Sequence, residues 1–271
     1  MSTFQLFFLL AAAFAFGSVI GSFLNVCIFR IPAQMSIIRP GSRCPKCLEP
    51  IRWYHNIPVA SWLILKARCA YCGESVPVRY PLVEALTGLL FALFFFRFGF
   101  HPVTLVFWLL SALLVAITFI DLDHQIIPDV ISLPGIPLGF LCSFAVPWVS
   151  WQSSLLGILA GGGSLLAIAL GYELLTKREG MGLGDVKLLA MLGAFLGVGA
   201  VFPIIFIGSV LGSLVGIPLM LLTRADRRLA LPFGPFLAAG TLIYGYFIDF
   251  WDPLMRWYGA ALIEIFRGIL T

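Results

Sequence analysis

The sequence predicts an all-α protein that crosses a membrane several times. Of its 271 residues, 61% are hydrophobic and 11% are charged, whereas a soluble domain carries about 25% charged residues. The apolar residues fall into long runs of about 17–25 residues, the length that a bilayer core demands. Because these runs are too long for barrel strands, and because a backbone in lipid must satisfy its own hydrogen bonds, we expect helices.

Eight apolar runs predict about eight transmembrane helices. The first run lacks the basic start and the small-residue cleavage site of a signal peptide, so we expect it to remain in the protein as a helix. The sixth and seventh runs are divided only at Phe202-Pro203, which leaves seven or nine spans open. The expected helices cover residues 4–28, 82–98, 104–121, 130–148, 154–176, 185–202, 203–223 and 234–250.

The basic residues predict the orientation of these helices. With the N-terminus outside, 14 of the 17 Lys and Arg lie on the inner side, many of them in the hydrophilic insert between the first two helices. Because cytoplasmic loops are enriched in Lys and Arg, we expect this insert to face the cytoplasm. Residues 251–271 place their apolar side chains on one helical face, which predicts an amphipathic helix at the lipid surface.

Four cysteines in the insert are spaced as metal ligands. Cys44 and Cys47 form one C-x2-C pair, and Cys69 and Cys72 form a second pair after 21 intervening residues. Two residues between thiolates let one turn present both sulfurs to one ion, and two such turns complete a tetrahedral zinc site. The alternative is two disulfides, which a reducing cytoplasm disfavours. Four thiolates leave no open position, so the predicted Zn²⁺ is structural and holds together an insert with little core of its own.

Carboxylates at the inner ends of two helices are the candidates for catalysis. Asp121 closes the third predicted helix and Asp185 opens the sixth, so the topology places both at the inner face. An ionisable side chain there is costly unless it is paired or functional. Two neighbouring carboxylates share a proton and titrate as a unit, so that one activates water while the other donates to the oxyanion. Gly182 and Gly184 would give an extended substrate backbone close access to Asp185.

Each carboxylate also has a structural interpretation. Asp185 could be an ordinary helix N-cap, and we favour that role for Asp129. Asp123 and His124 could be solvated loop residues, and for His124 the loop is preferred. Taken together on one face of the membrane, the carboxylates favour an aspartyl hydrolase.

At this point the sequence resembles a known family, the type IV prepilin peptidases, which belong to the intramembrane aspartyl proteases with a Gly-x-Gly-Asp motif. The resemblance covers nearly the whole chain, and its motifs are specific in order and spacing. They are Gly21 to Val26 with Arg30, Cys44 to Cys72 including Trp53 to Pro58, Arg79 to Glu84, Asp121 to Asp129, Gly182 to Lys187, and Pro232 to Pro235.

The resemblance implies an activity and a site. It makes Asp121 and Asp185 the catalytic pair, with Asp123 and Asp129 as supporting residues of the first motif. It implies a prepilin or pseudopilin substrate, cut after a Gly at the cytoplasmic face of the bacterial inner membrane. The new N-terminal residue is then methylated with S-adenosylmethionine. The segments expected are a first transmembrane helix (1–29), a cytoplasmic zinc-binding domain (30–81), a transmembrane aspartyl protease domain (82–250) and an interfacial tail (251–271).

No motif assigns the S-adenosylmethionine site. We expect it between Gly21 and Gly88, with Glu84 as one acidic candidate and an ion pair between Glu84 and Arg79 as the alternative interpretation. A transporter with paired carboxylates is a second candidate function, although no inverted repeat supports it. A peptidase without methyltransferase activity is a third, and the four cysteines favour the bifunctional form. Besides membrane lipids and the substrate, no nucleic-acid partner is expected, and the oligomeric state is open.

Overall fold

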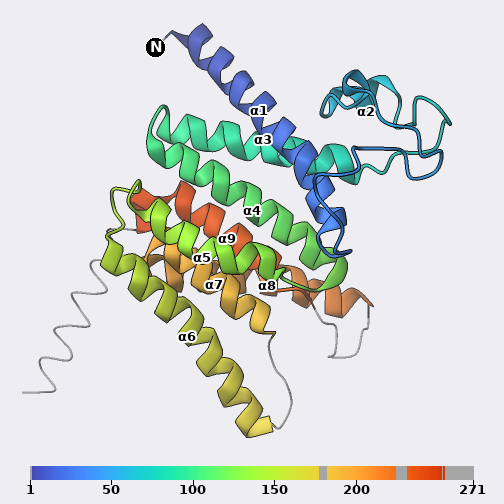
Figure 1. Cartoon of the computed structure of the whole chain (residues 1–271). Coiled ribbons are helices and arrows are strands. Elements are labelled where there is room, and N and C mark those ends of the chain that lie inside the picture. The colour runs from blue at the N-terminus through green and yellow to red at the C-terminus, as the bar shows by residue number, and fades with distance from the viewer. Residues whose placement is uncertain (1, 177–181, 224–230, 252, 254–271) are drawn as a thin grey trace, which may run out of the picture. The chain divides into compact units, whose positions relative to one another are not determined.

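A computed structural model describes residues 2–176, 182–223, 231–251 and 253 (Figure 1). The described residues form helices, with two isolated β-bridges in the insert and no strand among them. This confirms the predicted all-α class. The chain divides into two compact units, Met1–Pro128 and Asp129–Thr271, which we describe separately.

Three long helices and the insert make up the first unit. The helices are α1 (Thr3–Arg30), α3 (Arg79–Phe98) and α4 (Pro102–His124). Ser2 and Gln5 form a capping box at the start of α1, which satisfies two backbone N–H groups that the helix itself cannot pair. α4 runs to His124, three residues beyond the predicted end, so the loop expected for Asp123 and His124 is wrong.

Close backbone packing joins α1 to α3. A Cβ atom added to Gly88 would lie 2.4 Å from the Ser18 hydroxyl oxygen and 2.7 Å from the Phe14 carbonyl oxygen. Glycine therefore lets the two backbones approach, as small residues do between membrane helices. α4 packs on α3 through Trp108, whose indole N–H donates to the Phe91 carbonyl at 2.8 Å.

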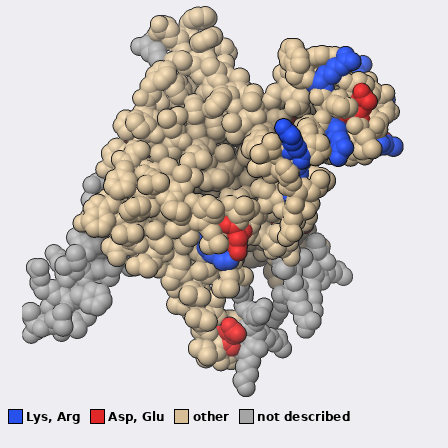
Figure 2. Space-filling model, viewed as in Figure 1, with Lys and Arg blue, Asp and Glu red and all other residues tan. Residues whose placement is uncertain are grey.

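The insert between α1 and α3 contains two short helices, η1 (Trp53–His55) and α2 (Ala60–Ile64). Figure 2 shows that Lys and Arg gather on this lobe of the molecule. Two hydrogen bonds fix the ends of α1 and α3 beside the insert, one joining α1 to α3 and the other joining the insert to α3. The Asn25 amide donates to the Tyr80 carbonyl at 3.1 Å, and the Val59 N–H donates to the Glu84 carboxylate at 2.7 Å.

α7 lies at the centre of the second unit. Its helices are α5 (Asp129–Ser143), α6 (Trp151–Thr176), α7 (Leu183–Leu196), α8 (Val198–Thr223) and α9 (Gly234–Tyr246). α7 contacts the other four, and every residue from Leu188 to Leu196 is buried. A Cβ atom on Gly193 would lie 2.1 Å from the Gly157 carbonyl oxygen of α6, so glycine is required at this crossing.

The break between the sixth and seventh predicted helices differs from the expectation. The helices part at Gly197, which has a φ of +79°, a conformation that glycine adopts without steric cost. Pro203, which was expected to divide them, lies inside α8. Proline at this sixth helical position cannot donate to the Gly199 carbonyl, and the helix continues without that one bond.

Each of the eight predicted segments contains a helix, but their lengths differ. Five helices, α1, α3, α4, α6 and α8, are long and apolar enough to cross a membrane. α5, α7 and α9 have 15, 14 and 13 residues, which at about 1.5 Å per residue is shorter than a hydrocarbon core of about 30 Å. The count of eight spans therefore stays a prediction. The expected amphipathic helix over 251–271 lies almost wholly outside the described residues.

Candidate functional site

Two turns of the insert share one backbone pattern. In the first, the Cys44 N–H donates to the Glu49 carbonyl and the Leu48 N–H donates to the Cys44 carbonyl, both at 3.0 Å. The second repeats these bonds 25 residues later, from Cys69 to Glu74 at 2.7 Å and from Gly73 to Cys69 at 3.0 Å. A β-bridge closes each turn, Arg43 to Pro50 and Arg68 to Ser75. Both turns have the sequence Arg-Cys-x-x-Cys-x-Glu, a repeat that the cysteine spacing alone does not indicate.

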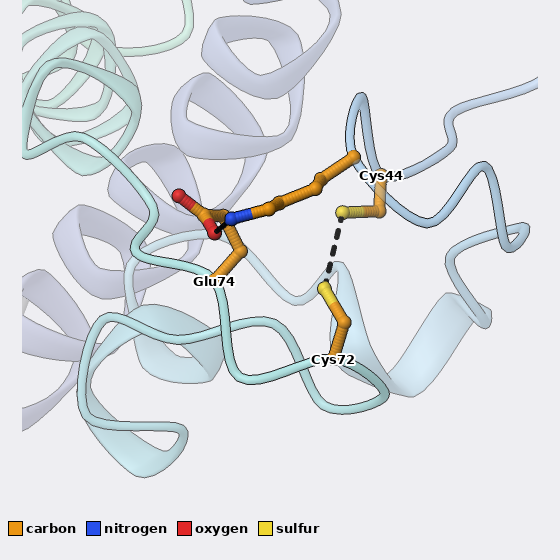
Figure 3. Close-up of polar contacts among 4 residues, drawn as sticks. Cys44, Cys72 and Glu74 are labelled. Carbon is orange, nitrogen blue, oxygen red and sulfur yellow. Dashed lines mark hydrogen bonds and ion pairs between the residues drawn. The ribbon is translucent and has the colours of Figure 1, made fainter.

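The two turns bring the four cysteine sulfurs into one cluster, and Figure 3 shows the sulfurs of Cys44 and Cys72 directed toward each other. The sulfurs of Cys44, Cys47, Cys69 and Cys72 all lie within 4.8 Å of one another, and those of Cys44 and Cys72 are 3.8 Å apart. Four sulfurs about 2.3 Å from a tetrahedral zinc ion would be about 3.8 Å from each other. The donor set and its spacing therefore fit Zn²⁺. All six cysteines of the chain are free thiols, so the pair of disulfides is not formed.

Local hydrogen bonds stabilise the thiolate of Cys44. Backbone N–H groups of Cys47 and Lys46 lower the pKa of Cys44 to about 6, and the thiolate is the form that binds metal. Lys46 in the first turn forms an ion pair with Glu74 in the second, which ties the two turns together (Figure 3). That pairing raises the pKa of Lys46.

The first aspartate motif lies at the end of α4. Asp121 is buried, with 5% of its surface exposed, in the last turn of the helix. Asp123 forms an ion pair with Arg79, the first residue of α3. The Arg79 guanidinium also donates to the Phe119 carbonyl at 3.4 Å and lies over the Phe119 ring. Arg79 therefore connects the start of α3 to the helix end that carries Asp121.

The second aspartate motif opens α7. Gly182 occupies the N-cap position and Asp185 is the third helical residue, so the N-cap interpretation of Asp185 is wrong. Asp129 is the first residue of α5, and the Lys187 ammonium donates to its two carboxylate oxygens at 2.7 and 2.9 Å. The pair fixes the start of α5 to the start of α7, a role that the sequence did not indicate for Lys187.

The structure brings some predicted site residues together and leaves others in separate units. The four cysteines form one cluster, and Asp129 lies beside the helix start that carries Gly184 and Asp185. Asp121 belongs to the first unit and Asp185 to the second, so their pairing stays a prediction. Arg79 pairs with Asp123 and Glu84 accepts from the Val59 N–H, so the alternative interpretation, an ion pair between Glu84 and Arg79, is wrong.

Two family models match the chain. Residues 15–98 match the Bacterial Peptidase A24 N-terminal domain, and residues 108–217 match the Type IV leader peptidase family. Together they cover the insert with its cysteines and both aspartate motifs. No solved structure matches the chain.

Curated proteins named "Prepilin leader peptidase/N-methyltransferase" are similar over most of the chain. The one from Neisseria gonorrhoeae is 37% identical over 92% of this chain and 95% of its own length. The one from Aeromonas hydrophila is 38% identical over 90% and 92%. A third, from Myxococcus xanthus, is 44% identical over 79% of this chain and 64% of its own length.

Proposed function

The chain belongs to the prepilin leader peptidase/N-methyltransferase family, and on that premise we propose how its residues carry out the two reactions. It is an enzyme that cleaves the leader from prepilins and methylates the N-terminal residue that cleavage exposes. The observation that carries this conclusion is the similarity to these enzymes over nine-tenths of both chains. A transporter is not favoured, because no such similarity supports one.

Asp121 and Asp185 are proposed as the catalytic pair. The ionised carboxylate takes a proton from water, and the hydroxide oxygen attacks the carbonyl carbon of the scissile peptide bond. The protonated carboxyl group donates to the developing oxyanion. The C–N bond then breaks, and the leaving amine gains a proton. Asp123 and Asp129 are supporting residues in this proposal.

Two features support a shared site for these carboxylates. Asp121 and Asp185 each lie at the end of a helix. In the proposed setting, the carboxylate there can contact water while the rest of the helix stays in lipid. In addition, Asp129 follows Asp121 by eight residues in the sequence, and it is ion-paired with Lys187, which follows Asp185 by two. Gly182 and Gly184, beside Asp185, present no Cβ atoms to an extended substrate.

The four cysteines are proposed to hold one structural Zn²⁺, because their sulfurs have the spacing that a tetrahedral ion requires. The ion would supply cohesion to the insert and no chemistry of the reaction, since four thiolates fill its coordination sphere. S-adenosylmethionine is the proposed methyl donor, because the second activity in the family's name is that of an N-methyltransferase.

The proposed setting is the bacterial inner membrane. The prevalence of Lys and Arg on one side supports an N-terminus outside, with the insert and both aspartate motifs at the cytoplasmic face. We propose the segments 1–29, 30–81, 82–250 and 251–271 as first helix, zinc domain, protease domain and lipid-surface tail. Pilins and the pseudopilins of type II secretion are the proposed substrates.

Cleavage of a purified prepilin by the purified chain, read by mass, tests the proposal. We expect Asp121→Asn and Asp185→Asn each to lower the rate by at least about 100-fold, since each removes one acid–base function. Asp249→Asn, which changes an exposed aspartate outside both motifs, is the control and should cut normally. Cutting at the normal rate by either motif variant would refute the assignment. Addition of S-adenosylmethionine should then raise the mass of the product by one methyl group.

A further inference from the structure

A cavity lies within the first unit, between the insert and the ends of α1 and α3 that flank it. Its volume is about 440 Å³, which is within the range of about 300–1,000 Å³ of pockets for small molecules. Its wall is mostly apolar and includes Phe29, Ile57, Leu65 and Val76. Polar residues of both the helices and the insert, among them Arg30, His55 and Glu84, also line it, and an apolar wall with polar groups is the usual composition of a cofactor site.

Glu84 is the buried acidic group of this cavity. It is 8% exposed and accepts a hydrogen bond from the Val59 N–H at 2.7 Å. An ionised carboxylate has about four acceptor positions, so this bond leaves capacity for hydroxyl or cationic groups of a ligand. A carboxylate buried in an apolar wall is costly without such partners.

The backbone that contacts Glu84 is strained. Val59 has a φ of +61° and a ψ of −52°, and the Ala60 N–H donates to the Pro58 carbonyl at 2.6 Å, which makes a γ-turn centred on Val59. This form of γ-turn is rare, and its positive φ is unfavourable for a β-branched residue such as Val59. Strained backbone is common at ligand-binding sites. Here the strained turn directs the Val59 N–H toward the Glu84 carboxylate.

A second polar group in the wall has no partner in the described part of the chain. The Nδ1 atom of His55 is buried and makes no hydrogen bond there. The His55 ring lies edge-on between Tyr54 and Tyr71, at centroid distances of 4.5 and 5.8 Å. A ligand with a hydrogen-bonding aromatic base could satisfy the nitrogen, and the aromatic rings nearby would attract a cation.

From these features we infer that this cavity binds S-adenosylmethionine, with Glu84 as a binding residue. The inference rests on the proposed methyltransferase activity and locates its cofactor. The ligand carries a sulfonium, a ribose diol, an adenine and an amino-acid carboxylate. Glu84 suits the diol or the cationic groups, and His55 suits the adenine. Arg30, whose guanidinium also donates to the Ser36 carbonyl at 2.9 Å, lines the same cavity and is complementary to the carboxylate.

The transfer that such a site serves balances without a further reagent. The lone pair of the substrate's terminal amine forms a bond to the methyl carbon, and the carbon–sulfur bond breaks with its electrons going to sulfur. S-adenosylhomocysteine leaves as a neutral thioether, and the amine gives up one proton to solvent.

Binding measured without any pilin tests the inference independently of activity. The zinc-loaded full chain in detergent is titrated calorimetrically with S-adenosylhomocysteine. We expect Glu84→Gln to weaken binding at least tenfold. Ile57→Trp fills the cavity from a side chain that is 45% exposed, so it should abolish binding without changing charge. Thr87→Val lies one turn further along α3 and outside the cavity wall, and it should bind as the unchanged chain does.

Zinc content and helical content are measured for each variant to show that it is folded. If Glu84→Gln loses zinc, it is not properly folded, and the binding measured for Ile57→Trp then decides whether the cavity is the site. The inference is overturned if both cavity variants bind as tightly as the unchanged chain, or if photo-cross-linked S-adenosylmethionine maps outside residues 22–84. If the unchanged chain methylates pilin in either case, the proposed function stands and only the location is wrong. If it neither methylates nor binds, both fail.

Discussion

The cysteine cluster and the aspartate motifs reach their geometry by different routes. All four sulfurs come from two turns with the same hydrogen bonds, and both turns lie within residues 44–74. Asp121 and Asp185 instead lie at the ends of α4 and α7, and each of these helices is held by the packing of its own unit.

Because of this difference, the two sites depend on different interactions. A site made by two local turns should depend on the proposed Zn²⁺, because few apolar side chains of the insert are buried. A site made at helix ends depends on the close packing of long helices. Damage to one should therefore spare the other, and four predictions test this from the largest expected effect to the smallest.

Loss of the ion should have the largest effect, and it should be confined to the insert. We expect Cys44→Ser, or treatment with a strong chelator, to remove zinc and unfold residues 31–78, since structural zinc contributes on the order of 10 kcal/mol to folding. Limited proteolysis should cut the insert rapidly while the membrane helices keep their circular dichroism. Metal analysis checks the zinc.

The matched control is Cys142→Ser, a cysteine of α5 that lies outside the cluster. It should keep about one zinc per chain and an intact insert. Rapid cleavage of the insert in this variant, or a stable insert in Cys44→Ser, would show that the turns do not depend on the ion.

Disrupting the crossing of α7 and α6 should impair the aspartate site and leave the insert intact. Gly193→Val places a side chain 2.1 Å from the Gly157 carbonyl oxygen, where only backbone can give way. We expect a loss of about 3 kcal/mol or more in stability, since overpacking costs about 1–3 kcal/mol and a backbone clash more. Prepilin cleavage should fall because Asp185 lies on the displaced helix, while the zinc content stays unchanged.

Gly163→Val on α6 is the matched control. A Cβ atom added there meets nothing within 4 Å, so the same change of residue should leave both the melting temperature and cleavage close to those of the unchanged chain. Loss of zinc in Gly193→Val would contradict the separation of the two sites.

The same difference explains how far the sequence could predict each site. The cysteine spacing predicted the cluster because two residues between thiolates define one turn, and the turn needs no distant partner. The aspartates were predicted to share a leaflet from topology alone. The sequence did not predict their ion pairs, Arg79–Asp123 and Asp129–Lys187. Each pair joins two helices, and composition does not determine how each helix is rotated about its own axis.

Helix boundaries show a similar limit. The predicted starts and ends follow hydropathy, which cannot distinguish the last polar turn of a helix from a loop, so α4 was ended at Asp121 instead of His124. Because proline lacks an N–H, Pro203 predicts a break, whereas the chain turns at Gly197, where φ is positive. The Val59 turn and the cavity beside it leave no periodic signal at all.

An intermediate effect is expected at Arg79, which connects the helix after the insert to the first aspartate motif. Arg79→Met should remove the ion pair with Asp123 and the bond to the Phe119 carbonyl, and hydrogen bonds of charged groups contribute about 1.5–3 kcal/mol. We expect kcat for prepilin cleavage to fall about tenfold with KM little changed. Arg39→Met, elsewhere in the insert, should not change kcat. An equal loss in both variants would show a general charge effect instead.

The smallest effect is expected at the pair of Asp129 and Lys187. Their side chains are 58% and 32% exposed, and an ion pair in such a position contributes about 0.2–1 kcal/mol. Asp129→Asn, Lys187→Met and the double variant form a cycle that isolates the coupling. If the pair holds the start of α7 in place, each single change should lower the cleavage rate a few-fold, and the double variant should lose no more than either single one. Zinc should remain bound throughout, because no part of this pair lies in the insert. Fully additive losses would mean that the two side chains act separately, and α7 would then be held by its buried face from Leu188 to Leu196 alone.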